Sequence, residues 1–176
     1  MALRLERLIR DVPDFPKPGI VFKDITPLLR DPEGFRAAVE GLAAPLEKGK
    51  VDAVVGIESR GFLFGAALAT HLGTGFVPIR KPRKLPWKTR AESYALEYGT
   101  DTVEIHEDAV RPGERVLLVD DLLATGGTME ASCKLVEGLG GEIAACSFVV
   151  ELAFLKGRER LRGRRIHSLI RYGEEG

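Results

Sequence analysis

The chain has 176 residues, enough for one domain of ordinary size, and its 44% hydrophobic and 30% charged residues exclude a disordered chain. No apolar run is long enough to cross a bilayer, and the charged start Met1–Arg10 is unlike a signal peptide, so we expect a cytoplasmic protein. The 26 basic and 26 acidic residues balance, which gives no reason to expect a nucleic acid or a membrane as partner.

Apolar spacing and helix-capping residues predict alternating helices and strands. In chain order, we expect a short helix over Leu3–Ile9, an irregular segment with three prolines over Asp11–Gly19, and a helix that begins after Asp31. There follow a strand at Val51–Ile57, a helix at Gly61–Leu72, a strand at Phe76–Ile79, a basic stretch at Arg80–Arg90, and a hairpin with arms at Tyr94–Tyr98 and Thr102–Ile105. The last elements are strands at Val116–Val119, Ile143–Val150 and Ile166–Ile170 and a helix at Gly126–Leu139.

The strands read as uninterrupted apolar runs, each followed by a loop or helix. Such runs are typical of an α/β fold with a mostly parallel sheet that helices cover on both faces. In these sheets a ligand binds beyond the carboxyl ends of the strands, where the strand-to-helix loops gather. We therefore look for the site in those loops.

The strongest motif is the run VLLVDDLLATGGT at Val116–Thr128. A turn at a helix N-terminus presents unpaired N–H groups, glycines let an anion approach them, and threonine hydroxyls add donors, so the run predicts a phosphate cradle. The cradle residues are Ala124, Thr125, Gly126, Gly127 and Thr128. Asp120 and Asp121 suit the vicinal hydroxyls of a sugar or a hydrated Mg²⁺ ion, and together with the cradle they indicate a ribose 5-phosphate. The alternative is that these residues only cap a helix.

The loop GIESRGF at Gly56–Phe62 also follows a buried strand. Ser59 and Arg60 offer a hydroxyl and a guanidinium to an anion, which suggests that Arg60 binds pyrophosphate. The basic stretch at Arg80–Arg90 is interrupted by prolines, and by its composition alone a solvated charge run is the simpler interpretation. After a strand of a phosphate-binding sheet it is also compatible with a mobile lid over pyrophosphate.

These motifs, with VPDFPKPGIVFKDITP at Val12–Pro27, resemble the purine phosphoribosyltransferases of the type I fold over nearly the whole chain, and VDDLLATGGT resembles the adenine-specific form of their phosphoribosyl pyrophosphate motif. The resemblance implies a type I phosphoribosyltransferase fold in a single domain, 1–176, in which residues 1–30 form a small base-binding hood. It implies transfer of a 5-phosphoribosyl group to adenine, Mg²⁺ carried in on the substrate near Asp120 and Asp121, and a homodimer.

The same resemblance assigns roles to single residues. Glu97 matches the family's acid–base glutamate and Arg60 joins it in catalysis; Ser59, Arg60, Lys81 and Lys84 contact pyrophosphate; Val21, Phe22, Lys23 and Leu122 bind adenine, the first and third through backbone groups. It also implies a cis peptide bond on one side of Ser59.

Two alternatives remain open. The first is transfer to a 6-oxopurine, which would need donors where adenine needs acceptors. The second is a non-catalytic regulator that uses the ribose phosphate pocket as a nucleotide sensor; the chain shows neither a nucleic-acid-binding module nor the basic excess expected of one.

Overall fold

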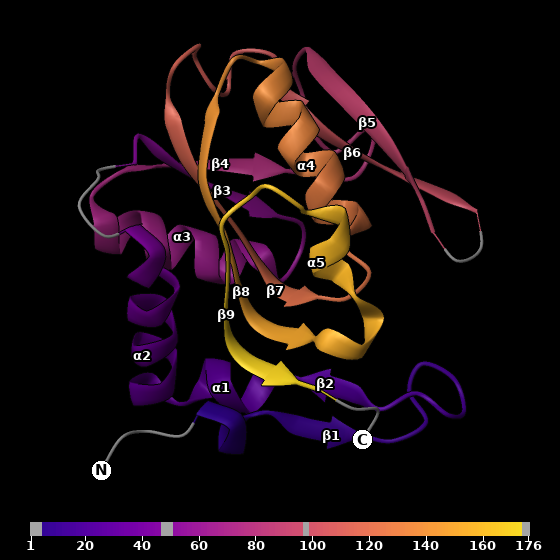
Figure 1. Cartoon of the computed structure of the whole chain (residues 1–176). Coiled ribbons are helices and arrows are strands. Elements are labelled where there is room, and N and C mark those ends of the chain that lie inside the picture. Colours follow the sequence, from indigo (N-terminus) through magenta and orange to yellow (C-terminus); the bar gives the residue numbers. More distant parts are fainter. Residues whose placement is uncertain (1–4, 47–50, 97–98, 174–176) are drawn as a thin grey trace.

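The computed structural model describes residues 5–46, 51–96 and 99–173. Its centre is a five-stranded parallel sheet with the strand order β4-β3-β7-β8-β9 (Figure 1). The strands are β3 (Ala53–Ile57), β4 (Gly75–Ile79), β7 (Arg115–Leu123), β8 (Glu142–Leu152) and β9 (Ile166–Tyr172). The predicted α/β architecture with a parallel sheet is therefore confirmed.

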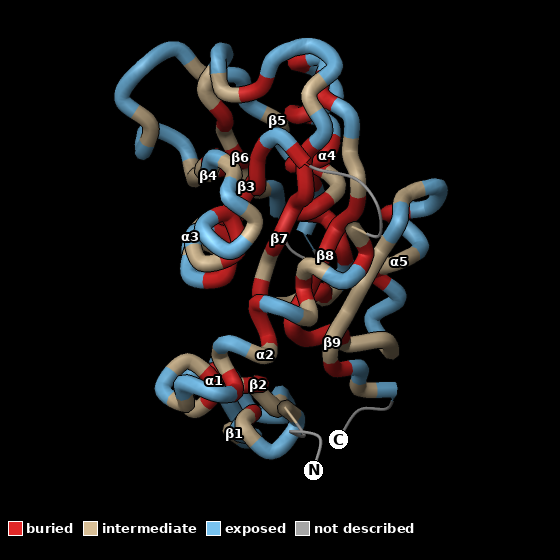
Figure 2. The backbone as a smooth tube through the Cα atoms, turned by 90° about the vertical axis from the view of Figure 1, so that its left-hand side faces the viewer, coloured by how far each residue is buried: buried red, intermediate tan, exposed pale blue. Residues whose placement is uncertain are grey.

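Successive side chains of the central strands point to opposite faces of the sheet, so one strand serves two cores. In β7, Val116 and Leu118 belong to one buried cluster, whereas Leu117 and Val119 belong to the other. Figure 2 shows β7 and β8 as almost continuously buried. This double burial explains why these strands read as unbroken apolar runs.

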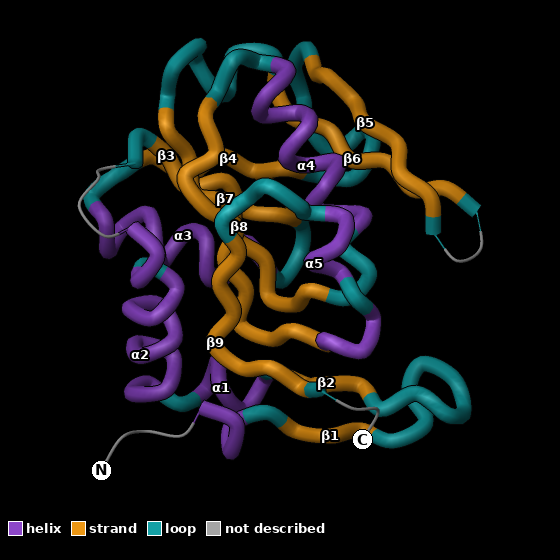
Figure 3. The backbone as a smooth tube through the Cα atoms, viewed as in Figure 1, coloured by secondary structure: helices purple, strands orange, loops and turns teal. Residues whose placement is uncertain are grey.

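Helices cover both faces of the sheet (Figure 3). Helices α2 (Pro32–Leu42) and α3 (Gly61–Leu72) pack on one face, and α4 (Gly127–Gly138) packs on the other. Local signals fix their ends: the Asp31 carboxylate accepts a hydrogen bond of 2.7 Å from the Gly34 amide, and Gly73 ends α3 at φ 67°. None of the helices in the described ranges combines the length and the apolar character that spanning a bilayer requires.

A separate layer is built from the N-terminal residues. It contains a 3₁₀ turn (Leu5–Leu8), the antiparallel strands β1 (Arg10–Val12) and β2 (Phe22–Asp24), and the short helix α1 (Thr26–Arg30). Figure 1 shows this layer beside the end of β9. Ile9, Ile25 and Leu28 anchor it in the cluster beneath α2 and α3.

A two-stranded antiparallel hairpin of β5 (Thr89–Ala95) and β6 (Thr100–His106) projects from the sheet next to α4 (Figure 1). Val103 and Ile105 of its inner face are buried in the same core as α4. The hairpin is tied to the end of β4 by an isolated bridge between Arg80 and Glu104.

Several predicted element bounds were wrong. The first helix is only a 3₁₀ turn, and β7 does not end at Val119 but continues through the two aspartates to Leu123, because β8 pairs with it as far as Leu123 and Glu151. The first arm of the hairpin begins at Thr89 inside the basic stretch, and its strand is described as far as Ala95; the predicted end of this arm, at residues 97–98, lies outside the described residues. The structure adds β1, β2 and α1 to the predicted elements, together with a short helix α5 (Gly157–Arg160) after β8 and two 3₁₀ turns (Ala44–Leu46 and Ala153–Leu155).

Candidate active site

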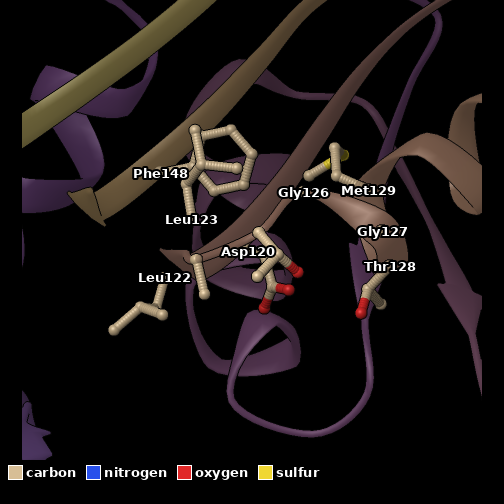
Figure 4. A pocket seen from close by; sticks show the side chains of 10 residues that line it. Asp120, Leu122, Leu123, Gly126, Gly127, Thr128, Met129 and Phe148 are labelled. Carbon is tan, nitrogen blue, oxygen red and sulfur yellow. The ribbon is translucent and has the colours of Figure 1, made fainter. Parts of the chain in front are cut away.

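The predicted phosphate cradle connects β7 to α4. Gly126 precedes the helix at φ 86°, a backbone conformation that favours glycine, and the following residues begin the twelve-residue helix. The loop lines a cavity of about 70 Å³, together with side chains from the ends of β7 and β8 (Figure 4). Amides at a helix N-terminus and the hydroxyl of Thr128 are suited to an anion in this cavity.

The two adjacent aspartates occupy different surroundings. The Asp121 side chain is only 7% exposed, and its Oδ2 accepts a hydrogen bond of 2.5 Å from Nε of Arg60. Asp120 lines the cavity, with its carboxylate and the Thr128 hydroxyl on the two sides of the open space in Figure 4. Burial, and after it the neighbouring charge of Asp121, raises the pKa of Asp120 well above its ordinary value. A bound cation would reduce the repulsion between the two carboxylates, and hydrogen bonds from a pair of sugar hydroxyls would favour their charged forms.

The loop after β3 approaches Asp120 closely. The peptide bond between Glu58 and Ser59 is cis, one of the two bonds that the resemblance indicates. A Cβ on Gly61 would lie 2.9 Å from Oδ1 of Asp120, so glycine is required for this approach. Ser59 and Arg60 are exposed beside the aspartates.

Glu58 organises the start of the basic stretch. Its carboxylate accepts two hydrogen bonds of 3.1 Å from the Arg80 guanidinium and one of 2.9 Å from the Lys81 amide. The hydrogen bond from Arg80 is the main reason why the pKa of Glu58 is lowered. This contact fixes the backbone that carries Lys81.

Lys81 and Lys84 differ in their placement. Lys81 points toward the site, where its ammonium contacts Asp101 and donates to the Tyr94 hydroxyl at 3.2 Å. The Lys84 side chain is exposed and lines neither cavity, whereas its carbonyl accepts a hydrogen bond of 3.1 Å from Arg80.

A second cavity of about 320 Å³ joins these groups. It is lined by Glu58, Ser59, Arg60, Lys81, Asp120, Asp121, Leu122, Ala124 and Thr128. It shares Asp120, Leu122, Ala124 and Thr128 with the cavity of the phosphate cradle. The structure thus brings the residues predicted for pyrophosphate, ribose and phosphate, with the exception of Lys84, to one place at the carboxyl ends of β3 and β7.

The predicted base-binding residues of the N-terminal layer lie beside this place and line neither cavity. The guanidinium of Arg60 lies 5.4 Å from the centroid of the Phe22 ring, which connects the layer to the β3 loop. The Lys23 side chain is buried, donates to Asp11 at 2.7 Å and lies over the ring of Tyr172 at 4.1 Å. The Lys23 ammonium is therefore already paired with a carboxylate of the same layer. Glu97 lies outside the described residues, so its position is not part of this geometry.

Sequence reasoning missed a support beneath the cradle. A Cβ on Gly126 would lie 2.6 Å from the carbonyl oxygen of Gly157, the first residue of α5. The next residue, Arg158, donates two hydrogen bonds of 2.7 Å to the buried carboxylate of Glu151, which also accepts from Ser168 at 2.7 Å. The only sequence signal for this support is a glycine between two charged residues, which is common in surface turns.

Comparisons with known proteins agree with this geometry. The model of the phosphoribosyl transferase domain family matches residues 29–166. The chain is 61% identical to the adenine phosphoribosyltransferase of Acidobacterium capsulatum, over 97% of this chain and 94% of that protein, and 58% identical to that of Methylococcus capsulatus, over 96% and 99%.

Solved structures give the same result. The crystal structure of adenine phosphoribosyltransferase from Thermoanaerobacter pseudethanolicus has a TM-score of 0.92 at 57% identity and covers 96% of this chain and 98% of that one. The enzyme from Saccharomyces cerevisiae, crystallised with adenine and an imino-altritol bisphosphate, has a TM-score of 0.89 at 42% identity, over 94% and 96%.

Proposed function

The chain belongs to the adenine phosphoribosyltransferases of the phosphoribosyl transferase domain family, and we propose which of its residues carry out each part of the reaction. These enzymes are pentosyltransferases of purine salvage, which convert adenine and phosphoribosyl pyrophosphate to AMP and pyrophosphate. The observation that supports the assignment is the shared wall of the two cavities, where the β3 loop, the paired aspartates and the phosphate cradle meet.

The 5-phosphate occupies the cradle Ala124–Thr128. The amides at the start of α4 and the hydroxyls of Thr125 and Thr128 donate to it. Asp120 and Asp121 accept hydrogen bonds from the ribose hydroxyls. The anomeric carbon then lies in the larger cavity, between the cradle and the β3 loop.

The leaving pyrophosphate is held by Ser59, Arg60, Lys81 and Lys84. Arg60 is partly preordered, because Asp121 fixes its Nε at 2.5 Å while its side chain is still 46% exposed. The terminal nitrogens of its guanidinium can then donate hydrogen bonds to the pyrophosphate, on which negative charge develops as it departs.

Mg²⁺ enters with the substrate. Asp120 and Asp121 are its ligands from the protein, and the oxygens of the substrate complete the coordination. Two adjacent carboxylates, one of them with a raised pKa, fit a divalent cation. When bound, the ion neutralises charge on the leaving group.

Adenine binds against the N-terminal layer, with residues 1–30 as its hood within a single domain. Phe22 and Leu122 sandwich the ring, and backbone groups of Val21 and Lys23 read its edge. Support comes from Phe22 lying next to Arg60 and from Leu122 lining both cavities. Glu97 accepts the proton that the incoming base loses and favours the cationic sugar of the transition state.

We also propose a homodimer and a cytoplasmic location. Sedimentation equilibrium tests the first: a species of twice the chain mass is expected, and a monomer at all concentrations would contradict it. The location is supported by Cys133 and Cys146, which are free buried thiols of the kind found in reducing compartments.

The decisive experiment is an assay of AMP formation from adenine and phosphoribosyl pyrophosphate with Mg²⁺ and with chelator. We expect turnover on adenine that depends on Mg²⁺. Hypoxanthine and guanine serve as matched acceptors, and a preference for either would replace adenine as the substrate. Tight binding of the nucleotide without turnover would instead indicate a non-catalytic regulator that uses the pocket as a nucleotide sensor.

A further inference from the structure

The Tyr94 hydroxyl joins the two anion-binding parts of the site. It accepts a hydrogen bond of 3.2 Å from the Lys81 ammonium and one of 3.0 Å from the Thr128 hydroxyl, and it donates to Asp101 at 3.0 Å. Asp101 also contacts the Lys81 ammonium directly. Lys81 follows β4, Thr128 lies in the first turn of α4, and Tyr94 and Asp101 face each other across the β5–β6 hairpin.

Counting donors shows what this network does to the site. A tyrosine hydroxyl has one proton and two lone pairs, and here all three are used. The single proton of Thr128 points to Tyr94, and two of the three protons of Lys81 are directed to Asp101 and Tyr94. These are the donors that phosphate oxygens would need in the cradle and in the pyrophosphate site.

The charges reinforce the network. Burial by itself would lower the pKa of Lys81, but the hydrogen bonds with Asp101 and Tyr94 outweigh it and raise that pKa. Burial would likewise raise the pKa of Asp101, but the hydrogen bond from Lys81 outweighs it and the pKa is lowered. Both groups are therefore charged at neutral pH, as an ion pair with side chains 38% and 33% exposed.

We propose that Asp101 and Tyr94 are positioning residues that hold Lys81 and Thr128 before a phosphate ligand binds, and that pyrophosphate binds by displacing Asp101 from Lys81. The inference rests on the proposed function, because it takes Lys81 and Thr128 as ligands of the two phosphate groups. Asp101 thereby keeps the ammonium neutralised between turnovers and limits the affinity for pyrophosphate, which favours its release as product.

The test measures binding of magnesium pyrophosphate and of AMP to the wild-type protein by isothermal titration calorimetry. Asp101→Asn removes the competing charge and keeps the side-chain shape. We expect pyrophosphate to bind roughly three- to tenfold more tightly, the range expected for a partly exposed ion pair, while AMP binding is unchanged. Tyr94→Phe keeps the ring and releases one donor on Lys81 and one on Thr128, so it should tighten the binding of both ligands.

A double-mutant cycle separates this role from a structural one. In a Lys81→Ala background, Asp101→Asn should no longer change the affinity for pyrophosphate, because its partner is gone. Asp108→Asn, at an exposed carboxylate just after β6, removes the same charge away from the network and should change neither affinity. Thermal unfolding of each variant verifies that it is folded.

The inference is overturned if Asp101→Asn binds pyrophosphate as weakly as wild type, if it acts equally in the Lys81→Ala background, or if Tyr94→Phe leaves AMP binding unchanged. These measurements need no turnover. A wild-type protein that forms no AMP while Asp101→Asn tightens pyrophosphate would refute the proposed function alone.

Discussion

Gly126 of the phosphate cradle and Gly157 of α5 pack backbone against backbone. A Cβ on Gly126 would lie 2.6 Å from the Gly157 carbonyl oxygen, and a Cβ on Gly157 would overlap the Ala124 carbonyl oxygen. The cradle is therefore held from behind by the start of α5, and its amides can keep their direction only while both positions lack a side chain.

Gly157→Ala should accordingly push the cradle out of position. We expect the KM for phosphoribosyl pyrophosphate and the Kd for AMP to rise roughly ten- to hundredfold, since a displacement of about 1 Å has this effect in a binding site. Steady-state kinetics and calorimetry measure it. Gly75→Ala is the matched control, because a Cβ there meets nothing within 4 Å; equal effects from both changes would refute the role of α5.

Glu151→Gln should destabilise the protein through the same support. The buried Glu151 carboxylate pairs with Arg158 and Arg171, and although burial opposes it, these contacts lower its pKa from 4.5. Removing the charge should reduce the free energy of unfolding at neutral pH by roughly 1 to 3 kcal/mol.

The pH dependence of that loss follows from the lowered pKa. The stabilisation is complete above the ordinary value of 4.5 and disappears as the pH falls through the lower folded-state value, so the variant and wild type should converge in acid. Urea unfolding at several pH values checks this. Glu137→Gln, at a carboxylate 45% exposed that also pairs with an arginine, should have little effect. A constant difference at every pH would contradict the explanation.

Asp120→Asn combined with Asp121→Asn should weaken AMP binding roughly tenfold or more, because two charged acceptors for the ribose hydroxyls are lost. Comparing AMP with 2′,3′-dideoxy-AMP isolates this contribution. The dideoxy nucleotide should bind both proteins alike, whereas an equal loss for the two ligands would count against the contact with the diol.

Glu97→Ala should lower kcat by about 10²- to 10⁴-fold and leave the KM for both substrates nearly unchanged, as expected for proton transfer in the transition state. Glu107→Ala, at an exposed acid just beyond β6, is the control for loss of a carboxylate. Parallel losses in kcat and in binding would deny Glu97 its acid–base role.

Replacing Lys81 and Lys84 together by Ala should raise the KM for phosphoribosyl pyrophosphate about tenfold or more. The single variants should differ, because Lys81 lines the cavity and the Lys84 side chain is exposed. Lys88→Ala, at another exposed position of the basic stretch, serves as control. Wild-type kinetics in the double variant would return the stretch to the solvated-surface interpretation.

Part of the fold could be predicted from patterns in short, contiguous stretches of the sequence. Helix α3 was predicted from Gly61 to Leu72 with Gly73 as its end, because apolar spacing and a left-handed glycine are local features. The length of β7 was not predictable in this way. Its aspartates are strand residues only because β8 pairs with them, and such pairing is a tertiary contact that no local pattern encodes.

The residues of the candidate site also divide into those that a local sequence pattern reveals and those that only tertiary contacts reveal. The cradle and the β3 loop were predictable as candidates because each is a short contiguous motif with its own chemistry. Tyr94, Asp101 and Gly157 were missed because their importance comes from contacts with residues far along the chain: Lys81 and Thr128 for the first two, Ala124 and Gly126 for the third. The prolines of the N-terminal segment also concealed β1 and β2, which pair on either side of that irregular loop.

The two loops predicted to bind anions leave the sheet from adjacent strands, since β3 and β7 pair in register from Ala53 with Val116 to Gly56 with Val119. Neighbouring strands are about 4.8 Å apart, and that spacing cannot change without breaking backbone hydrogen bonds. The sheet therefore fixes the distance between the starts of the two loops. A ligand that contacts both loops at once must match this fixed distance, however the surrounding side chains adjust.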